Sequence, residues 1–233
     1  MAVLAAPSTT SPVAGGKRLR ATRDSQRVGR VLGVDGEKPH RRRIRAACRA
    51  RIGGEEETTD VRETTGEIES LQRLLDASRA RANGHLRGII NDERTLTAAQ
   101  LTELLTGMKV LAVATVTAAG EPRVSAVDGH FLHGTWTFST AGDSAKAGHL
   151  ERRPAISVAH IHGEEMALFS HGDANRLPAG PELDEVDAHW TEHYGSSPFS
   201  WGDDVRMYRL RMTWAVAYAF ERDRLLASRG ITA

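Results

Sequence analysis

The spacing of apolar residues changes along the chain from a helical pattern to a strand pattern near Gly107. Before that point, two segments begin with capping-box spacing, Thr64-Thr65-Gly66-Glu67 and Thr97-Ala98-Ala99-Gln100. Leucines and one isoleucine follow at helical intervals: Ile68, Leu71, Leu74 and Leu75 in the first segment, and Leu101, Leu104 and Leu105 in the second. The pattern predicts one helix that Asn83-Gly84 stops and a shorter one that Gly107 ends. The first has a narrow apolar stripe and would be marginal alone.

After Gly107 the apolar residues recur with a period of two, which is typical of strands. The first two strands, at 110–117 and 123–128, are joined by the turn Ala118-Ala119-Gly120-Glu121 and form a hairpin. His133-Gly134 is a second turn. Further strands are predicted at 135–139, 156–161, 165–175, 205–212 and 214–220, and helices at 142–153 and 181–194. Short strands with few helices predict a mainly β fold, an antiparallel barrel without exposed sheet edges.

The first 63 residues have no sustained apolar periodicity and carry an unbalanced charge. Residues 1–54 hold thirteen Lys and Arg against three Asp and Glu, although the whole chain has a net charge of only +1. We predict a disordered basic segment at 1–63, a short helical linker at 64–94 and a barrel domain at 95–233. The basic segment would suit nucleic-acid binding through phosphates. It has no aromatic residue to stack on bases, which favours an unstructured tail or a misassigned start instead.

The cysteine content and the lengths of the apolar runs indicate the cellular location to expect. Cys48 is the only cysteine, so neither an intramolecular disulfide nor a cysteine-based zinc cage is possible. No apolar run reaches the ~18 residues that a membrane helix needs. The first sixteen residues lack the positively charged start of a signal peptide. We expect a cytoplasmic protein without a membrane partner.

The segment from Phe138 to Leu150 carries the strongest chemical signal. A strand leads through a turn rich in hydroxyl groups, containing Ser139, Thr140 and Ser144, into a helix that holds Lys146. The start of a helix attracts anions through its free N–H groups, and hydroxyls with one lysine would complete a phosphate clamp. The alternative is that Asp143 or Ser144 caps the helix and Lys146 is solvated.

Several blocks of this chain, in the same order and with the same spacing, resemble the pyridoxamine 5'-phosphate oxidase-like split-barrel family. The resemblance is closest to its actinobacterial flavin and deazaflavin oxidoreductases. It covers about residues 96–220 and rests on the segments 111–117, 120–127, 136–140, 144–146 and 154–158 together with Leu150.

The resemblance implies a split β-barrel that binds FMN, or alternatively the deazaflavin coenzyme F420, in a homodimer. It places the cofactor phosphate on Ser139, Thr140, Ser144 and Lys146, and the ring system along the strand Arg123, Val124, Ser125, Ala126 and Val127. Relatives often carry further basic residues near Gly142 and Gly148. Lys146 is therefore the main cation expected in this clamp.

The histidines are a weaker signal. His189-Trp190-Thr191-Glu192-His193 fits a zinc-peptidase pattern in which two histidines one helical turn apart share a metal. The short pattern often arises by chance, so we predict no metal site. His160-Ile161-His162 places two imidazoles on one strand face, and a solvated edge is the simpler interpretation.

These observations favour an oxidoreductase that transfers a hydride to or from a small unsaturated molecule by means of its flavin. A non-catalytic flavin-binding protein is the first alternative, and a nucleic-acid-associated protein the second. The substrate and the catalytic residues are not specified by the sequence.

Overall fold

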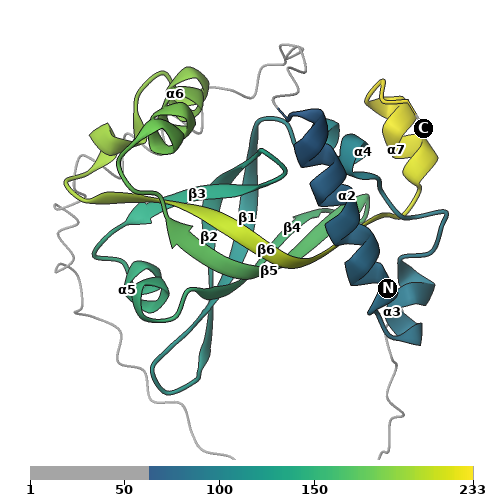
Figure 1. The fold of residues 1–233 in the computed structure, drawn as a ribbon, viewed down its shortest axis with the longest axis horizontal. Helices are drawn as coiled ribbons and strands as arrows, with labels where there is room; N and C mark the ends of the chain where they lie inside the picture. Colours follow the sequence, from purple (N-terminus) through teal and green to yellow (C-terminus); the bar gives the residue numbers. More distant parts are fainter. Residues whose placement is uncertain (1–62, 233) are drawn as a thin grey trace, which may run out of the picture. The chain divides into compact units, whose positions relative to one another are not determined.

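The computed structural model describes residues 63–232, and six strands of this part close into a barrel (Figure 1). Neighbouring strands are antiparallel, in the order β1-β2-β3-β6-β5-β4, so β4 returns to pair with β1. The strands are β1 (Met108–Val116), β2 (Pro122–Leu132), β3 (Thr135–Ala141), β4 (Ala155–His162), β5 (Met166–Arg176) and β6 (Val205–Ala219). The predicted mainly β barrel is confirmed.

Strand β6 differs from the prediction of two separate strands. The register of β5 against β6 shifts between His171, which faces Trp214, and Gly172, which faces Met212. Thr213 is thus an extra residue, and its hydroxyl donates to the His171 carbonyl. Such a bulge interrupts the alternation of apolar residues without ending the strand. Gly172 permits the close approach, because a Cβ there would lie 2.0 Å from the Arg211 carbonyl oxygen.

Closure of the barrel also corrects the interpretation of His160. This side chain is 9% exposed, and its Nδ1 lies 3.1 Å from the Val110 carbonyl oxygen. Strand β4 pairs with β5 along its whole length and with β1 at Ser157 to Ala159, so His160 follows a segment that is paired on both sides. His162, at the end of the strand, is exposed and lies beside Glu165.

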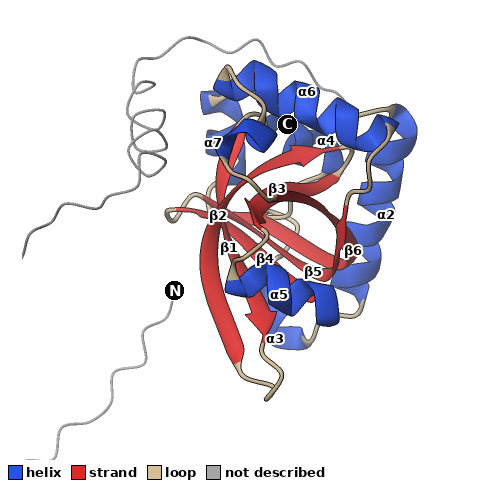
Figure 2. Cartoon of the chain, turned by 90° about the vertical axis from the view of Figure 1, so that its left-hand side faces the viewer, coloured by secondary structure: helices blue, strands red, loops and turns tan. Residues whose placement is uncertain are grey.

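Helices cover the barrel at its sides and ends (Figure 2). They are α2 (Thr65–Ala80), α3 (Gly84–Ile89), α4 (Ala98–Leu104), α5 (Ala145–Arg152), α6 (Pro181–Tyr194) and α7 (Arg222–Ser228), with a 3-10 turn, η1, at Pro198–Trp201. Both predicted capping boxes are present, at Thr64 and at Thr97. Asn83 caps the start of α3, a short helix that the sequence pattern did not predict.

Helix α2 packs against the barrel, and this packing explains how a narrow apolar stripe is sufficient to stabilise the helix. Leu71 and Leu75 belong to the same buried cluster as residues inside the barrel. The Ser78 hydroxyl accepts a hydrogen bond from the Ala215 backbone N–H on β6 at 3.0 Å. Most helical stability in proteins comes from such packing. The predicted disordered segment, apart from Glu63, lies outside the described residues.

Helix α6 covers the outer face of the sheet where β2, β3 and β6 meet. Its Val186 and Trp190 are fully buried against Leu132 and Met207. A tight turn joins β2 to β3, with His133 (φ 56°) and Gly134 (φ 70°) both in the left-handed region. No helix among residues 63–232 is long and apolar enough to cross a membrane.

Candidate cofactor-binding site

Three of the predicted phosphate ligands meet where β3 leads into α5. The Thr140 and Ser144 hydroxyl oxygens are 3.1 Å apart, and the Lys146 ammonium donates to the Thr140 hydroxyl at 3.3 Å. Ser144 is also the N-cap of α5, because its hydroxyl accepts from the Ala147 N–H at 3.2 Å. Ser144 therefore both caps α5 and contacts Thr140. Two hydroxyls and one ammonium converge on the positive end of a helix.

Ser139 lies differently from the other three. Successive side chains of a strand point to opposite faces, so Ser139 and Thr140 face opposite sides of β3. Ser139 faces Met207 on β6, and Thr140 faces Arg206. We call Thr140, Ser144 and Lys146 the phosphate clamp, after the role predicted for them, and Ser139 lies beside it on the other face of β3.

The predicted ring-binding strand forms the first half of β2, beside β1. Arg123 is paired with Thr115, and Ala126 with Ala112. Thr115 is buried, and its hydroxyl lies 2.9 Å from Nδ1 of His149 on α5. The Thr115–His149 contact brings Arg123 and α5 to the same end of the barrel. Arg123 itself is exposed and pairs with Glu121.

The sequence pattern missed Arg206, a second cation beside the clamp. Arg206 forms two hydrogen bonds with Asp204 and a third with Glu151 of α5. The hydrogen bonds from Arg206 hold the pKa of the Asp204 carboxyl below its usual range. Because two carboxylates surround Arg206, this triad adds no net positive charge to the clamp. The position of Arg206 beside the clamp follows only from the pairing of β3 with β6, which places it opposite Thr140. The local sequence pattern contains no signal for this pairing.

A cluster of polar side chains, of which His130 is buried and Asp128, His189 and His193 are partly buried, lies between β2 and α6. Nδ1 of His130 is 2.9 Å from Nε2 of His189, and the rings of His130 and His193 are 4.9 Å apart. Burial, with His189, His193 and Lys109 nearby, lowers the pKa of His130 to about 2. Burial raises the pKa of the neighbouring Asp128 carboxyl.

Two residues of the zinc-peptidase pattern at 189–193 contribute to the contact between α6 and the barrel. His189 contacts His130, and Trp190 is buried in the interface between α6 and the barrel. Among residues 63–232, no group of three His, Cys, Asp or Glu side chains is arranged to hold a metal ion.

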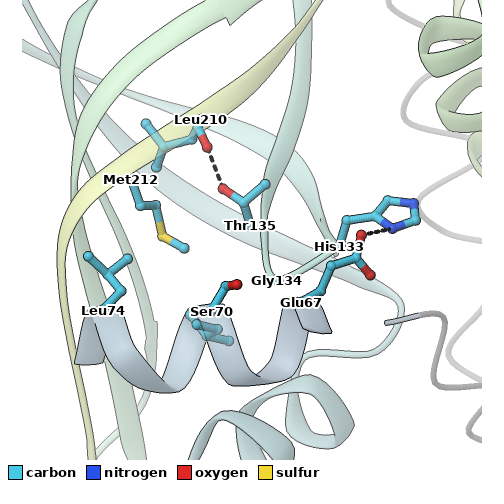
Figure 3. A pocket seen from close by; sticks show the side chains of 9 residues that line it. Glu67, Ser70, Leu74, His133, Gly134, Thr135, Leu210 and Met212 are labelled. Carbon is cyan, nitrogen blue, oxygen red and sulfur yellow. Dashed lines mark hydrogen bonds and ion pairs between the residues drawn. The ribbon is translucent and has the colours of Figure 1, made fainter. Parts of the chain in front are cut away.

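A hollow between α2 and the turn from β2 to β3 is separate from the clamp (Figure 3). It is lined by Leu71, Leu74, Leu210 and Met212 on its apolar side. His133 closes its polar side, with Nδ1 2.9 Å from Glu67 and Nε2 3.0 Å from Glu185 on α6. None of the predicted site residues lines this hollow.

A family model described as pyridoxamine 5'-phosphate oxidase matches residues 97–217, just over half of the 233 residues. The matched segment begins at the N-cap of α4 and ends within β6. A search of curated proteins found no match.

Solved structures similar to this chain include proteins of different description. A protein of unknown function from Agrobacterium tumefaciens is 26% identical, with 49% of this chain and 52% of that chain covered and a TM-score of 0.40. This chain thus spans about half the length of that protein. A haem storage protein from Vibrio cholerae is 22% identical, with 47% and 86% covered and a TM-score of 0.42. A protein described as an F420 reductase is 20% identical, with 48% and 92% covered and a TM-score of 0.39.

Proposed function

Because the chain belongs to the pyridoxamine 5'-phosphate oxidase family, we propose that it is an oxidoreductase that binds a flavin or deazaflavin by its phosphate. It would transfer a hydride to or from a small unsaturated molecule. The observation that carries the proposal is the convergence of Thr140, Ser144 and Lys146 at the start of α5. FMN is the proposed cofactor and coenzyme F420 the alternative, since both present a ribityl phosphate to such a clamp.

The residues of the clamp suit a phosphate group. Each hydroxyl can rotate to donate to a phosphate oxygen, and Lys146 can add a charge-assisted hydrogen bond. The backbone N–H groups of Ala145 and Lys146, the first two residues of α5, have no acceptor within the helix and complete the cradle. The strand Arg123 to Val127 would then lie along the ring system and orient it.

The flavin, when bound, supplies the hydride chemistry. The protein would contribute binding, orientation and exclusion of water. Backbone N–H groups on β2 can donate to the reduced ring without a titratable side chain. The single cysteine, Cys48, is consistent with a cytoplasmic location for such an enzyme.

We further propose that the protein is a homodimer. Outward-facing residues of β1, β2 and β4 form an exposed apolar face, in which Val110, Val124 and Ile161 are 58%, 72% and 59% exposed. Ala112 and Ala126, which face each other across β1 and β2, continue it. A patch of this kind is typical of a protein–protein interface. Val124 and Ala126 are also predicted ring-binding residues, so the partner would cover the cofactor.

An absorption spectrum tests the proposal directly. The protein is purified from a host that makes both FMN and coenzyme F420, and the bound cofactor is released and identified. A flavin or deazaflavin at about one per protomer supports the proposal, and protein without either, after both have been added in excess, contradicts it. Substrate turnover with the reduced cofactor then separates an enzyme from a non-catalytic flavin-binding protein.

A further inference from the structure

Arg206 connects three segments at the end of the barrel that holds the phosphate clamp. It lies near the start of β6, opposite Thr140 of β3. Its Nε donates to Asp204 Oδ1 at 3.2 Å, and its Nη2 to Asp204 Oδ2 at 2.8 Å. Its Nη1 donates to Glu151, which lies on α5 one residue before the helix ends. The Arg206 side chain is only 17% exposed.

The turn that precedes α5 is fitted around the same ion pair. The Gly142 backbone N–H donates to the Asp204 carbonyl at 2.7 Å. A Cβ on Gly142 would lie 1.9 Å from Asp204 Oδ2 and 2.4 Å from Arg206 Nε, so the pair occupies the space that a side chain would need. The start of β6 therefore holds α5 at both ends, at Gly142 before the helix and at Glu151 near its last turn.

Between these two attachment points lie Ser144 and Lys146. We propose that Arg206 is a positioning residue for the phosphate clamp: by bridging Asp204 and Glu151, it holds α5 at the distance from β3 at which Ser144 and Lys146 meet Thr140. This inference rests on the proposed function, because it assigns the clamp to a cofactor phosphate. Arg206 acts through the placement of α5, since its hydrogen bonds are directed to carboxylates.

Substitution of Glu151 separates positioning from simple electrostatics. Glu151→Ala removes a negative charge near the clamp, so charge alone predicts tighter binding of a phosphate. Loss of the bridge to α5 predicts the opposite, a weakening of FMN binding by about three- to tenfold. Asp173→Ala is the matched control, because it also removes a carboxylate from an arginine pair, Asp173 with Arg211 on β5 and β6. It should leave FMN affinity unchanged.

The coupling between Arg206 and Lys146 gives a second test. Arg206→Ala should weaken FMN binding by about tenfold, and riboflavin, which has no phosphate, should bind the variant as it binds wild type. If Arg206 acts by placing Ser144 and Lys146, adding Arg206→Ala to Lys146→Ala should weaken FMN binding by much less than the tenfold that Arg206→Ala causes alone. Losses that multiply would overturn the proposal, and so would tighter FMN binding by Glu151→Ala.

Amide hydrogen exchange measured without any flavin keeps the proposal testable if the cofactor assignment fails. The amides of Ala147 to Arg152 should exchange faster in Arg206→Ala and in Glu151→Ala than in wild type. In Asp173→Ala their exchange rates should equal those of wild type. Unchanged exchange in the first two variants would overturn the positioning role. A wild-type protein that does not prefer FMN to riboflavin would instead contradict the proposed function, whatever the exchange shows.

Discussion

Lys146 is the residue whose side chain should contribute most to cofactor affinity. It is the cation of the clamp that donates to Thr140, whereas Arg206 is engaged by two carboxylates. A charge-assisted hydrogen bond to phosphate contributes about 1.5–3 kcal/mol. Lys146→Ala should therefore weaken FMN binding by roughly ten- to a hundredfold, as measured by titration with flavin fluorescence.

Riboflavin is the control for this substitution. It should bind the wild type and Lys146→Ala equally, and the thermal unfolding of the two proteins should agree. An FMN affinity that the substitution leaves unchanged would place the phosphate elsewhere in the protein.

His130 should make the protein sensitive to acid. Its ordinary pKa of 6.5 in the unfolded chain falls to about 2 in the folded protein, where burial and the nearby His189, His193 and Lys109 disfavour its charge. Below pH 6.5 the unfolded chain therefore binds more protons than the folded one, and stability falls as the pH falls toward 2. From pH 7 to pH 5 this contributes a loss of up to about 2 kcal/mol.

Urea unfolding at pH 7, 6 and 5 measures this loss, and His130→Gln is the comparison. Glutamine does not titrate, so the free energy of unfolding of the variant should depend less steeply on pH. If the two proteins show the same pH dependence, His130 is not the group responsible.

Local signals in the sequence predicted most of the helices and strands of the described residues. The capping boxes at Thr64 and Thr97 locate the starts of α2 and α4, and the bounds of α6 agree with the predicted 181–194. The single strand β6 was not predictable, because the bulge at Thr213 breaks the alternation that a strand shows. Glu151 is far from Asp204 and Arg206 in sequence, and it meets them only through the pairing of β3 with β6 and the packing of α5.

Helix α2 should be required for folding, in contrast to the segment before it. Removal of residues 1–63 keeps the N-cap Thr64 and all helices and strands of the described part, so a single cooperative thermal transition should remain. Removal of residues 1–80 takes Leu71 and Leu75 out of the core, each worth about 2–5 kcal/mol, and the transition should be lost. Circular dichroism during heating distinguishes the two truncations, and if both unfold alike, α2 is not required for folding.

The apolar face of β1, β2 and β4 should mediate dimer formation. Light scattering at micromolar concentration should give a mass of twice 25.4 kDa. The double substitution of Val110 and Val124 by lysine should give monomers, because it would place charges in the interface. Phe199→Lys alters an exposed aromatic outside this face and should leave the dimer intact. A wild-type monomer with flavin bound would contradict this assignment.

We propose that this barrel holds a flavin through its phosphate, at Thr140, Ser144 and Lys146. The most direct test is a comparison of FMN with riboflavin on the wild-type protein freed of cofactor, because the two ligands differ only in the phosphate. The clamp predicts that FMN binds at least about tenfold more tightly, since one charge-assisted hydrogen bond alone accounts for that ratio. Equal affinity for FMN and riboflavin would contradict it.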